Sequence, residues 1–352
     1  MSILDDERAL REGDPGGMLD AIAGMPRHCR EGYELGHGAR DLPSGEGVTA
    51  IAVSGMGGSA VAGDVLRSLY ADRLRIPVVV VRSPQLPEWC GPHTLVIVSS
   101  YSGGTAETLS CFEEAVRRGC RIVAVTSGGE LGGRAKEREL ALVTVPGGFQ
   151  PRAALGYLAL GSLGALEAIG LLPAVAPELE ETVGELGALA AQLAPGVPTD
   201  INPAKQLAGA IGERVPVIWG AEGIGSVAAA RWKTQCNELA KVPAWAASLP
   251  ELDHNEVVGW SEDRGRGFFL VALRHEGEHP EIARRFALSI QIATGAGAGA
   301  EEVRSRGRSS LSQLLTLIMM GDFTATYLGL ARGVDPTPVE VITRLKEALA
   351  KS

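Results

Sequence analysis

Two short segments of this 352-residue chain combine glycine with hydroxylated side chains, a mixture that suits the binding of a phosphate group. The first reads G-M-G-G-S-A at 55–60, and the second, at 99–108, has serine or threonine at five positions besides a tyrosine. Each follows an apolar run typical of a strand and precedes a helical pattern. Glycine lets backbone N–H groups approach an anion at a helix N-terminus, and hydroxyls donate further hydrogen bonds. We therefore expect a phosphate monoester to bind here without a lysine or a metal.

Each segment has an alternative interpretation. The first also satisfies the G-x-G-x-x-A pattern of dinucleotide-binding folds, which need an acidic residue at the end of the second strand to hold a ribose. That strand ends here at Val81-Arg82, and because arginine can accept a 2′-phosphate, an NADP-dependent oxidoreductase stays open. The second segment could be a capped helix with Thr105 as N-cap and Thr108 at N3. Capping accounts for one or two of these residues but not for the whole cluster.

A zinc-protease pattern, H-E-x-x-H, occurs from His275 to His279. That chemistry needs both histidines on one face of a stable helix. Here Gly277 interrupts the pattern, Pro280 follows at once and an apolar strand pattern precedes it. We therefore expect a solvated turn and no metal site.

The composition excludes several classes of protein. A net charge of −9 and a pI of about 5.3 leave no broad basic surface for nucleic acid. Five scattered cysteines without a C-x-x-C pair predict reduced thiols in a cytoplasmic protein, and the acidic N-terminus lacks the pattern of a signal peptide. Residues 153–176 carry a single charge, Glu167, but glycines and Pro173 interrupt them. We expect a buried core helix there and no membrane span.

Strand and helix patterns alternate along the chain, which predicts parallel sheets with right-handed crossovers. Strands are expected at 49–53, 76–81, 95–99 and 121–126, with helices through 65–70 and 106–118. A weaker repeat of this order follows, with strands expected at 215–219 and 268–273 and a helix at 281–286. The pattern predicts two similar α/β lobes joined across the proline-rich stretch 195–203, with ligands at the carboxyl ends of the strands.

Segments in order along the chain resemble the motifs of the bifunctional phosphoglucose/phosphomannose isomerases, sugar isomerases of the SIS type. Residues 100–108, S-Y-S-G-G-T-A-E-T, are similar to the family's phosphate loop S-Y-S-G-N-T-x-E-T, with Gly104 in place of asparagine. Leu239 also stands where asparagine is expected. The other matching segments are the glycine turn 55–59, F-Q-P-R-A-A-L-G-Y at 149–157, R-W-K-T-Q-C-N-E at 231–238, P-E-L-D-H-N-E at 250–256, and G-V-D-P-T-P-V at 333–339 with Leu345-Lys346.

The resemblance implies an α/β fold of two SIS-type lobes, each a parallel sheet flanked by helices. It places an N-terminal arm at 1–48, a phosphate-binding SIS domain at 49–195, and a second SIS domain at 205–352 with the catalytic Glu and His and a C-terminal helix. The implied reaction interconverts glucose 6-phosphate and/or mannose 6-phosphate with fructose 6-phosphate through a cis-enediol and needs no cofactor. A non-catalytic sugar-phosphate-binding regulator is the alternative, because Gly104 alters the phosphate loop.

The family's residue roles carry over by position. Glu238 is the implied base, Arg152 stabilises the enediolate, and His254 opens the sugar ring together with Lys346. In such isomerases the histidine comes from the neighbouring subunit, so the resemblance implies a homodimer with its active site near the subunit interface. The implied ligands of the hexose 6-phosphate are Gly57, Gly58, Ser59, Ser100, Ser102 and Thr105.

Overall fold

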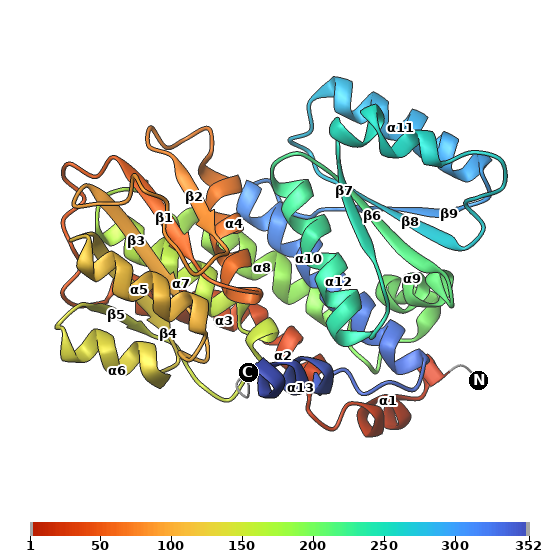
Figure 1. Cartoon of the computed structure of the whole chain (residues 1–352). Helices are drawn as coiled ribbons and strands as arrows, with labels where there is room; N and C mark the ends of the chain where they lie inside the picture. The colour runs from red at the N-terminus through yellow and green to blue at the C-terminus, as the bar shows by residue number, and fades with distance from the viewer. Residues whose placement is uncertain (1–2, 350–352) are drawn as a thin grey trace. The chain divides into compact units, whose positions relative to one another are not determined.

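The computed structural model describes residues 3–349, which form two compact units, each with its own parallel sheet (Figure 1). The first unit comprises Gly24–Ala188 and Ser305–Thr316, and the second comprises the rest of the described chain. Two helices, α8 (Ala176–Gln192) and α12 (Ser310–Ala331), contribute residues to both units. The predicted fold class, α/β with a parallel sheet flanked by helices in each lobe, is confirmed.

The sheet of the first unit has five parallel strands in the order β2-β1-β3-β4-β5. Its central strands are buried on both faces, so they read as unbroken apolar runs and not as alternating patterns. Ser54, the last residue of β1, pairs with Val98 next to the end of β3, so the carboxyl ends of these strands meet at one edge. The strands are β1 (Ala50–Ser54), β2 (Val78–Val81), β3 (Thr94–Ser99), β4 (Arg121–Thr126) and β5 (Ala141–Thr144).

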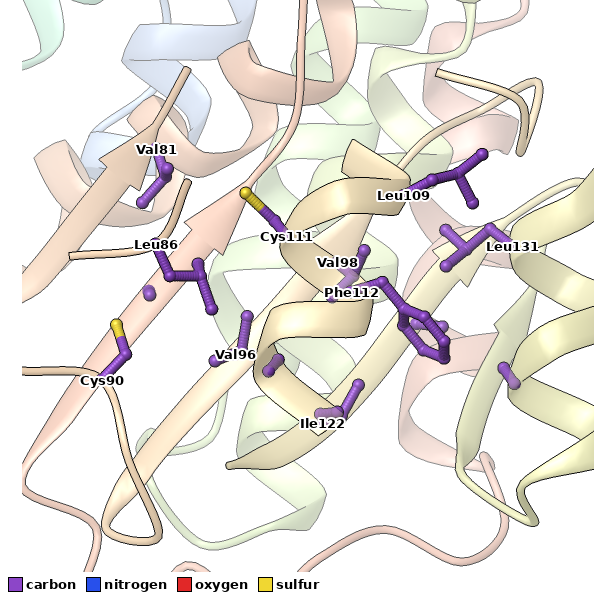
Figure 2. Close-up of a cluster of buried hydrophobic side chains, with 14 residues drawn as sticks. Val81, Leu86, Cys90, Val96, Val98, Leu109, Cys111, Phe112, Ile122 and Leu131 are labelled. Carbon is purple, nitrogen blue, oxygen red and sulfur yellow. The ribbon is translucent and has the colours of Figure 1, made fainter. Parts of the chain in front are cut away.

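Helices cover both faces of this sheet. On one face, α5 (Ala106–Arg117) and α6 (Gly129–Glu137) bury a cluster in which Phe112 packs with strand residues such as Val96 and Ile122 (Figure 2). The other face carries α4 (Gly58–Tyr70) and α7 (Leu155–Ala168), with α3 (Met25–His37) packed on α7. Residues 155–166 of α7 are buried, which confirms the core helix expected within 153–176.

The second unit has four parallel strands in the order β7-β6-β8-β9. Trp219 and Phe286 are fully buried in its core, where α11 covers one face of the sheet. The strands are β6 (Val215–Ala221), β7 (Trp245–Leu249), β8 (Phe268–Arg274) and β9 (Gly299–Arg304). The helices are α1 (Glu7–Gly13), α2 (Met18–Ala23), α9 (Pro203–Ile211), α10 (Ile224–Leu239), α11 (Pro280–Gly295) and α13 (Glu340–Leu349), besides short 3₁₀ turns.

The structure differs from the expected elements at several places. The edge strands β5, β7 and β9 were not predicted, and the helix expected at 281–286 extends over Pro280–Gly295. Residues 25–37, assigned to an N-terminal arm, form α3 and belong to the first unit. Among the described residues, α12 is the one helix long and apolar enough to cross a membrane. Because 94% of its apolar window is buried within the protein, we read it as a core helix.

Candidate phosphate and catalytic sites

Three consecutive strand-to-helix turns lie at the carboxyl edge of the first sheet, after β1, β3 and β4. The helices that follow, α4, α5 and α6, begin at the N-cap residues Gly57, Thr105 and Gly128, and none of the three caps makes a side-chain hydrogen bond to its helix. The first N–H groups of a helix have no partner within the helix and are satisfied by side chains, water or a ligand. This edge of the sheet can therefore bind an anion.

In the hydroxyl-rich loop after β3, two hydroxyl groups lie against each other and not against the backbone of the following helix. Thr105 occupies the N-cap position of α5, yet its hydroxyl lies 3.0 Å from the hydroxyl of Ser100 and does not cap the helix. The hydroxyl of Ser100 also accepts a hydrogen bond from Gly103 N–H at 3.2 Å, and Ser102 is exposed. Thr105 is therefore the N-cap residue by position, as the alternative interpretation has it, but its side chain does not cap the helix, and the hydroxyls of Ser100 and Thr105 pair beside the helix end.

The glycine turn after β1 packs on the same loop. Gly57 has φ 53°, and a Cβ on Gly58 would lie 3.0 Å from the carbonyl oxygen of Pro151. Ser59 is buried, and its hydroxyl accepts a hydrogen bond from Tyr101 N–H at 3.3 Å. Arg82, the residue that kept the NADP interpretation open, instead forms an ion pair with Asp64 of α4.

Arg152 lies next to this turn, in a 3₁₀ helix formed by Pro151–Ala153, and is only 3% exposed. The segment leading to it is held by Tyr101, whose hydroxyl donates to the carbonyl of Pro146 at 2.9 Å and accepts from Phe149 N–H at 3.0 Å. Tyr101 therefore joins the hydroxyl-rich loop to the segment that carries Arg152. Its position within the phosphate-loop motif alone does not predict this role.

His28 of α3 packs behind the same segment. Its ring stacks on Tyr157, with centroids 4.6 Å apart, and meets Phe149 edge-on at 4.8 Å. Neither ring nitrogen has a hydrogen-bond partner among the described residues, and burial lowers the pKa of His28 to about 4. The imidazole is thus a neutral, apolar support for the loop that leads to Arg152.

Glu238 lies in the second unit, next to the last residue of α10, and is half-buried. A buried ion pair ties α10 to α12: Arg231 donates from Nε and Nη2 to the two carboxylate oxygens of Asp322 at 3.3 and 3.1 Å. Burial raises the pKa of Asp322, and the guanidinium opposes that shift. Leu239 is fully buried, so its side chain belongs to the core of this unit.

His254 ends a 3₁₀ turn, Glu251–His254, and is exposed. Residues on both sides of it are anchored. The carboxylate of Asp253 accepts from Arg285 at 3.0 Å and from Ser289 at 2.7 Å, both on α11. The carboxylate of Glu256 accepts from the indole N–H of Trp219 at 2.8 Å. The backbone at His254 is therefore fixed while its imidazole faces outward.

The structure thus divides the predicted site residues between the two units. It brings together, at one edge of the first sheet, Gly57, Gly58, Ser59, Ser100, Ser102, Thr105 and Arg152. In the second unit, Glu238, His254 and Lys346 lie on three separate elements: α10, the 251–254 turn and α13. Lys346 is exposed, and α13 has no buried residue.

The H-E-x-x-H segment is a turn between β8 and α11, as predicted. His279 is the N-cap of α11 and accepts from Glu281 N–H at 3.2 Å. The expectation that the turn is solvated is wrong for Glu278, because its carboxylate is buried against Arg274 at 2.8 Å. No group of three or more His, Cys, Asp or Glu in the described chain is arranged to hold a metal ion.

One glycine-rich turn at this edge of the first sheet is not among the sequence predictions. Ser127-Gly128-Gly129 follows β4 and opens α6, so it repeats the signal of a strand, a glycine-rich turn and a helix that identified the other two turns. A search for every such turn, and not only for those dense in hydroxyls, would have found it.

Known proteins are similar to this chain in sequence and in fold. Residues 200–349 match the family model of the bacterial phospho-glucose isomerase C-terminal SIS domain. The chain is 37% identical over 336 residues to the bifunctional phosphoglucose/phosphomannose isomerase of Caldicellulosiruptor bescii, covering 95% of this chain and 99% of that one. It is 35% identical to the enzyme of the same name from Aquifex aeolicus, covering 89% and 93%. A solved hypothetical protein of Thermus thermophilus has a similar fold, with a TM-score of 0.76 at 18% identity, covering 99% and 94%.

Proposed function

Since the chain belongs to the family of the bifunctional phosphoglucose/phosphomannose isomerases, we propose that it interconverts glucose 6-phosphate and mannose 6-phosphate with fructose 6-phosphate. The observation that carries the proposal is the hydroxyl pair of Ser100 and Thr105 at the uncapped N-terminus of α5. Helix N–H groups and hydroxyls together suit a phosphate monoester, because they donate hydrogen bonds to its oxygens. We assign Ser102 and the Gly57–Ser59 turn to the same phosphate.

The reaction moves a proton between C2 and C1 of the open-chain sugar. We assign the base to Glu238: its carboxylate takes the C2 proton of the aldose, and the electron pair passes through C1 to the carbonyl oxygen, which gives a cis-enediolate. Return of the proton to C1, with transfer of the O2 proton to the O1 oxyanion, gives the ketose with its hydroxyl at C1. Glucose and mannose 6-phosphates share this enediol, because they differ only in configuration at C2.

Two further roles follow from the family resemblance. We assign the stabilisation of the negative charge on the enediolate to Arg152. Its buried guanidinium is a fixed cation that needs no reorganisation as the charge develops. We assign ring opening to His254 with Lys346, since an imidazole titrates near neutral pH and can transfer the ring proton. A homodimer in which His254 of one subunit serves the site of the other, with the active site near the interface, completes the proposal. We place the enzyme in the cytoplasm.

The deciding experiment starts from fructose 6-phosphate in deuterated water and follows both aldose products by NMR. We expect glucose 6-phosphate and mannose 6-phosphate together, each with deuterium at C2, because one base returns a proton that exchanges with solvent. A single epimer would restrict the enzyme to one isomerisation. Tight binding of fructose 6-phosphate without any product would favour a sugar-phosphate-binding regulator.

A further inference from the structure

The turn after β4 holds the carbonyls of the hydroxyl-rich loop. Ser127 donates to the carbonyl oxygen of Tyr101 from its backbone N–H at 3.0 Å and from its hydroxyl at 2.7 Å. Leu131, in the first turn of α6, donates its N–H to the carbonyl oxygen of Gly103 at 2.8 Å. Two alternate carbonyls of the loop are therefore bound by the segment 127–131.

This pattern orients the N–H groups of the loop. In a trans peptide the C=O of one residue and the N–H of the next point in opposite directions. Because the carbonyls of Tyr101 and Gly103 point into 127–131, the N–H groups of Ser102 and Gly104 point away from it. Tyr101 and Gly103 are buried, whereas Ser102 and Gly104 are exposed. The two N–H groups thus point to the exposed side of the loop, where the N–H of Gly104 also makes a long hydrogen bond to the Ser102 hydroxyl at 3.4 Å.

Two glycines allow the segments to come this close. A Cβ on Gly103 would lie 2.0 Å from the carbonyl oxygen of Gly128, and a Cβ on Gly129 would lie 2.3 Å from the carbonyl oxygen of Ser102. Both glycines also have positive φ, 70° and 62°. A side chain at either position would have to displace backbone: that of Gly128 for a side chain at 103, and that of Ser102 in the loop for a side chain at 129.

We propose that the segment 127–131 is a positioning element of the phosphate site and that Gly129 is its positioning residue. It aims the N–H groups of Ser102 and Gly104 at the phosphate monoester through the interlocked backbones and does not touch the ligand. The proposal rests on the assignment of the loop to substrate phosphate under the proposed function. A Cβ at 129 pushes the Ser102 carbonyl away and turns the two N–H groups with it.

The test compares Gly129→Ala with Gly170→Ala. Gly170 lies in the same unit but outside the 127–131 segment; it also has positive φ, 83°, and a Cβ there meets nothing within 4 Å, so this control has a positive-φ backbone without the contact. Gly133→Ala on α6, where the added Cβ also meets nothing within 4 Å, gives the reference for a neutral change. The readouts are the competitive inhibition constant of inorganic phosphate, KM and kcat with fructose 6-phosphate, and the thermal unfolding midpoint.

We expect Gly129→Ala to raise the inhibition constant of phosphate about tenfold or more above that of Gly170→Ala, as for loss of charge-assisted hydrogen bonds, and to change KM more than kcat. Equal inhibition constants in the two variants overturn the positioning role. If Gly129→Ala does not fold, Ser127→Ala removes one donor to the Tyr101 carbonyl without adding an atom. It should still weaken phosphate inhibition, and an unchanged constant would then contradict the proposal.

Failure of the proposed function is distinguishable in the same assay. Ser102→Ala removes a hydroxyl assigned to the phosphate and leaves the 127–131 segment intact. If Ser102→Ala weakens phosphate inhibition while Gly129→Ala matches its control, the phosphate site stands and the positioning role falls. If Ser102→Ala has no effect either, the phosphate binds elsewhere and both assignments fall.

Discussion

Two interior strands, β1 of the first sheet and β6 of the second, are each followed by a glycine N-cap with a similar backbone conformation. Gly57 and Gly223 are the N-caps of the helices that follow, with φ/ψ of 53°/−129° and 93°/−131°. The next turns along the two sheets differ in chemistry. After β3 the chain places Ser100, Ser102 and Thr105 at an uncapped helix, whereas after β8 it places the segment H-E-G-E-H.

The turn after β8 cannot serve a phosphate. Glu278 is committed to a buried ion pair with Arg274, and Glu276 adds a second negative charge. The helix that follows is capped by the ring of His279, which accepts its first free N–H. Turns at equivalent places of two similar α/β sheets thus differ in chemistry because their residues differ. The function of each half of this chain therefore has to be inferred from its own side chains.

The second unit supplies the change with the largest expected effect. Glu238→Gln should lower kcat by about 10²- to 10⁴-fold, the usual contribution of a general base, because an amide cannot accept the C2 proton. Inhibition by inorganic phosphate should stay as in the parent. Glu213→Gln, at an exposed carboxylate of the same unit, is the control. Parent-like turnover of Glu238→Gln would remove this residue from the mechanism.

The ion pair between α10 and α12 should matter to folding. Asp322→Asn leaves Arg231 as a buried cation without its counter-charge and should cost about 3–5 kcal/mol in the free energy of unfolding. The double variant Arg231→Met/Asp322→Leu should recover most of that loss, because apolar residues of similar volume replace both charges. Urea unfolding of the three proteins measures both effects. If Asp322→Asn is as stable as the parent, the charge of Arg231 is solvated.

The first unit should instead show a dependence on pH. The pKa of His28 is about 4 in the folded protein against an ordinary value of 6.5, so the unfolded chain binds the proton more tightly. The contribution of neutral His28 to the free energy of unfolding is complete above pH 6.5. It decreases by about 3 kcal/mol as the pH falls through 6.5 towards 4. His28→Phe should flatten that loss, because a phenyl ring binds no proton, and the change removes no hydrogen bond since the ring nitrogens have no partner among the described residues.

Urea unfolding at pH 7.5 and pH 5 measures the slope for His28→Phe and the parent. His37→Gln, at an exposed imidazole of the same helix, should keep the slope of the parent. An unchanged slope in His28→Phe would assign the acid sensitivity to other groups.

Removal of single hydroxyls from the hydroxyl-rich loop after β3 should give the smallest of these effects. Ser102→Ala and Thr105→Ala should each weaken binding of fructose 6-phosphate by about 1–3 kcal/mol, the value of a hydrogen bond to a charged group. Ser110→Ala, an exposed serine on α5, is the matched control. Titration calorimetry with fructose 6-phosphate and with fructose separates the phosphate term from the sugar term. Equal losses for both ligands would place these hydroxyls against the sugar.

Much of the first sheet could be predicted because its strands are locally unambiguous. The strand at 121–126 has the predicted bounds, and β1 and β3 differ from prediction by one residue, since buried parallel strands are continuous apolar runs. The edge strand β2 also reads as a run of valines, but the edge strand β9 carries no such signal. β9 reads G-A-E-E-V-R, and its glutamates belong to a strand only because β8 pairs with it.

The amino-acid sequence by itself determined that a hydroxyl-rich turn follows a strand and opens a helix, because residue types and their order along the chain suffice for that inference. Only the tertiary structure decided that the Thr105 hydroxyl meets Ser100 and leaves α5 uncapped, that 127–131 binds the loop carbonyls, and that Asp322 pairs with Arg231 across 91 residues. Two of these contacts join segments that are far apart in sequence. In the third, the hydroxyl of Thr105 has two potential partners, Ser100 and the backbone of α5. Such choices depend on the packing of whole elements, which no local pattern of residues contains.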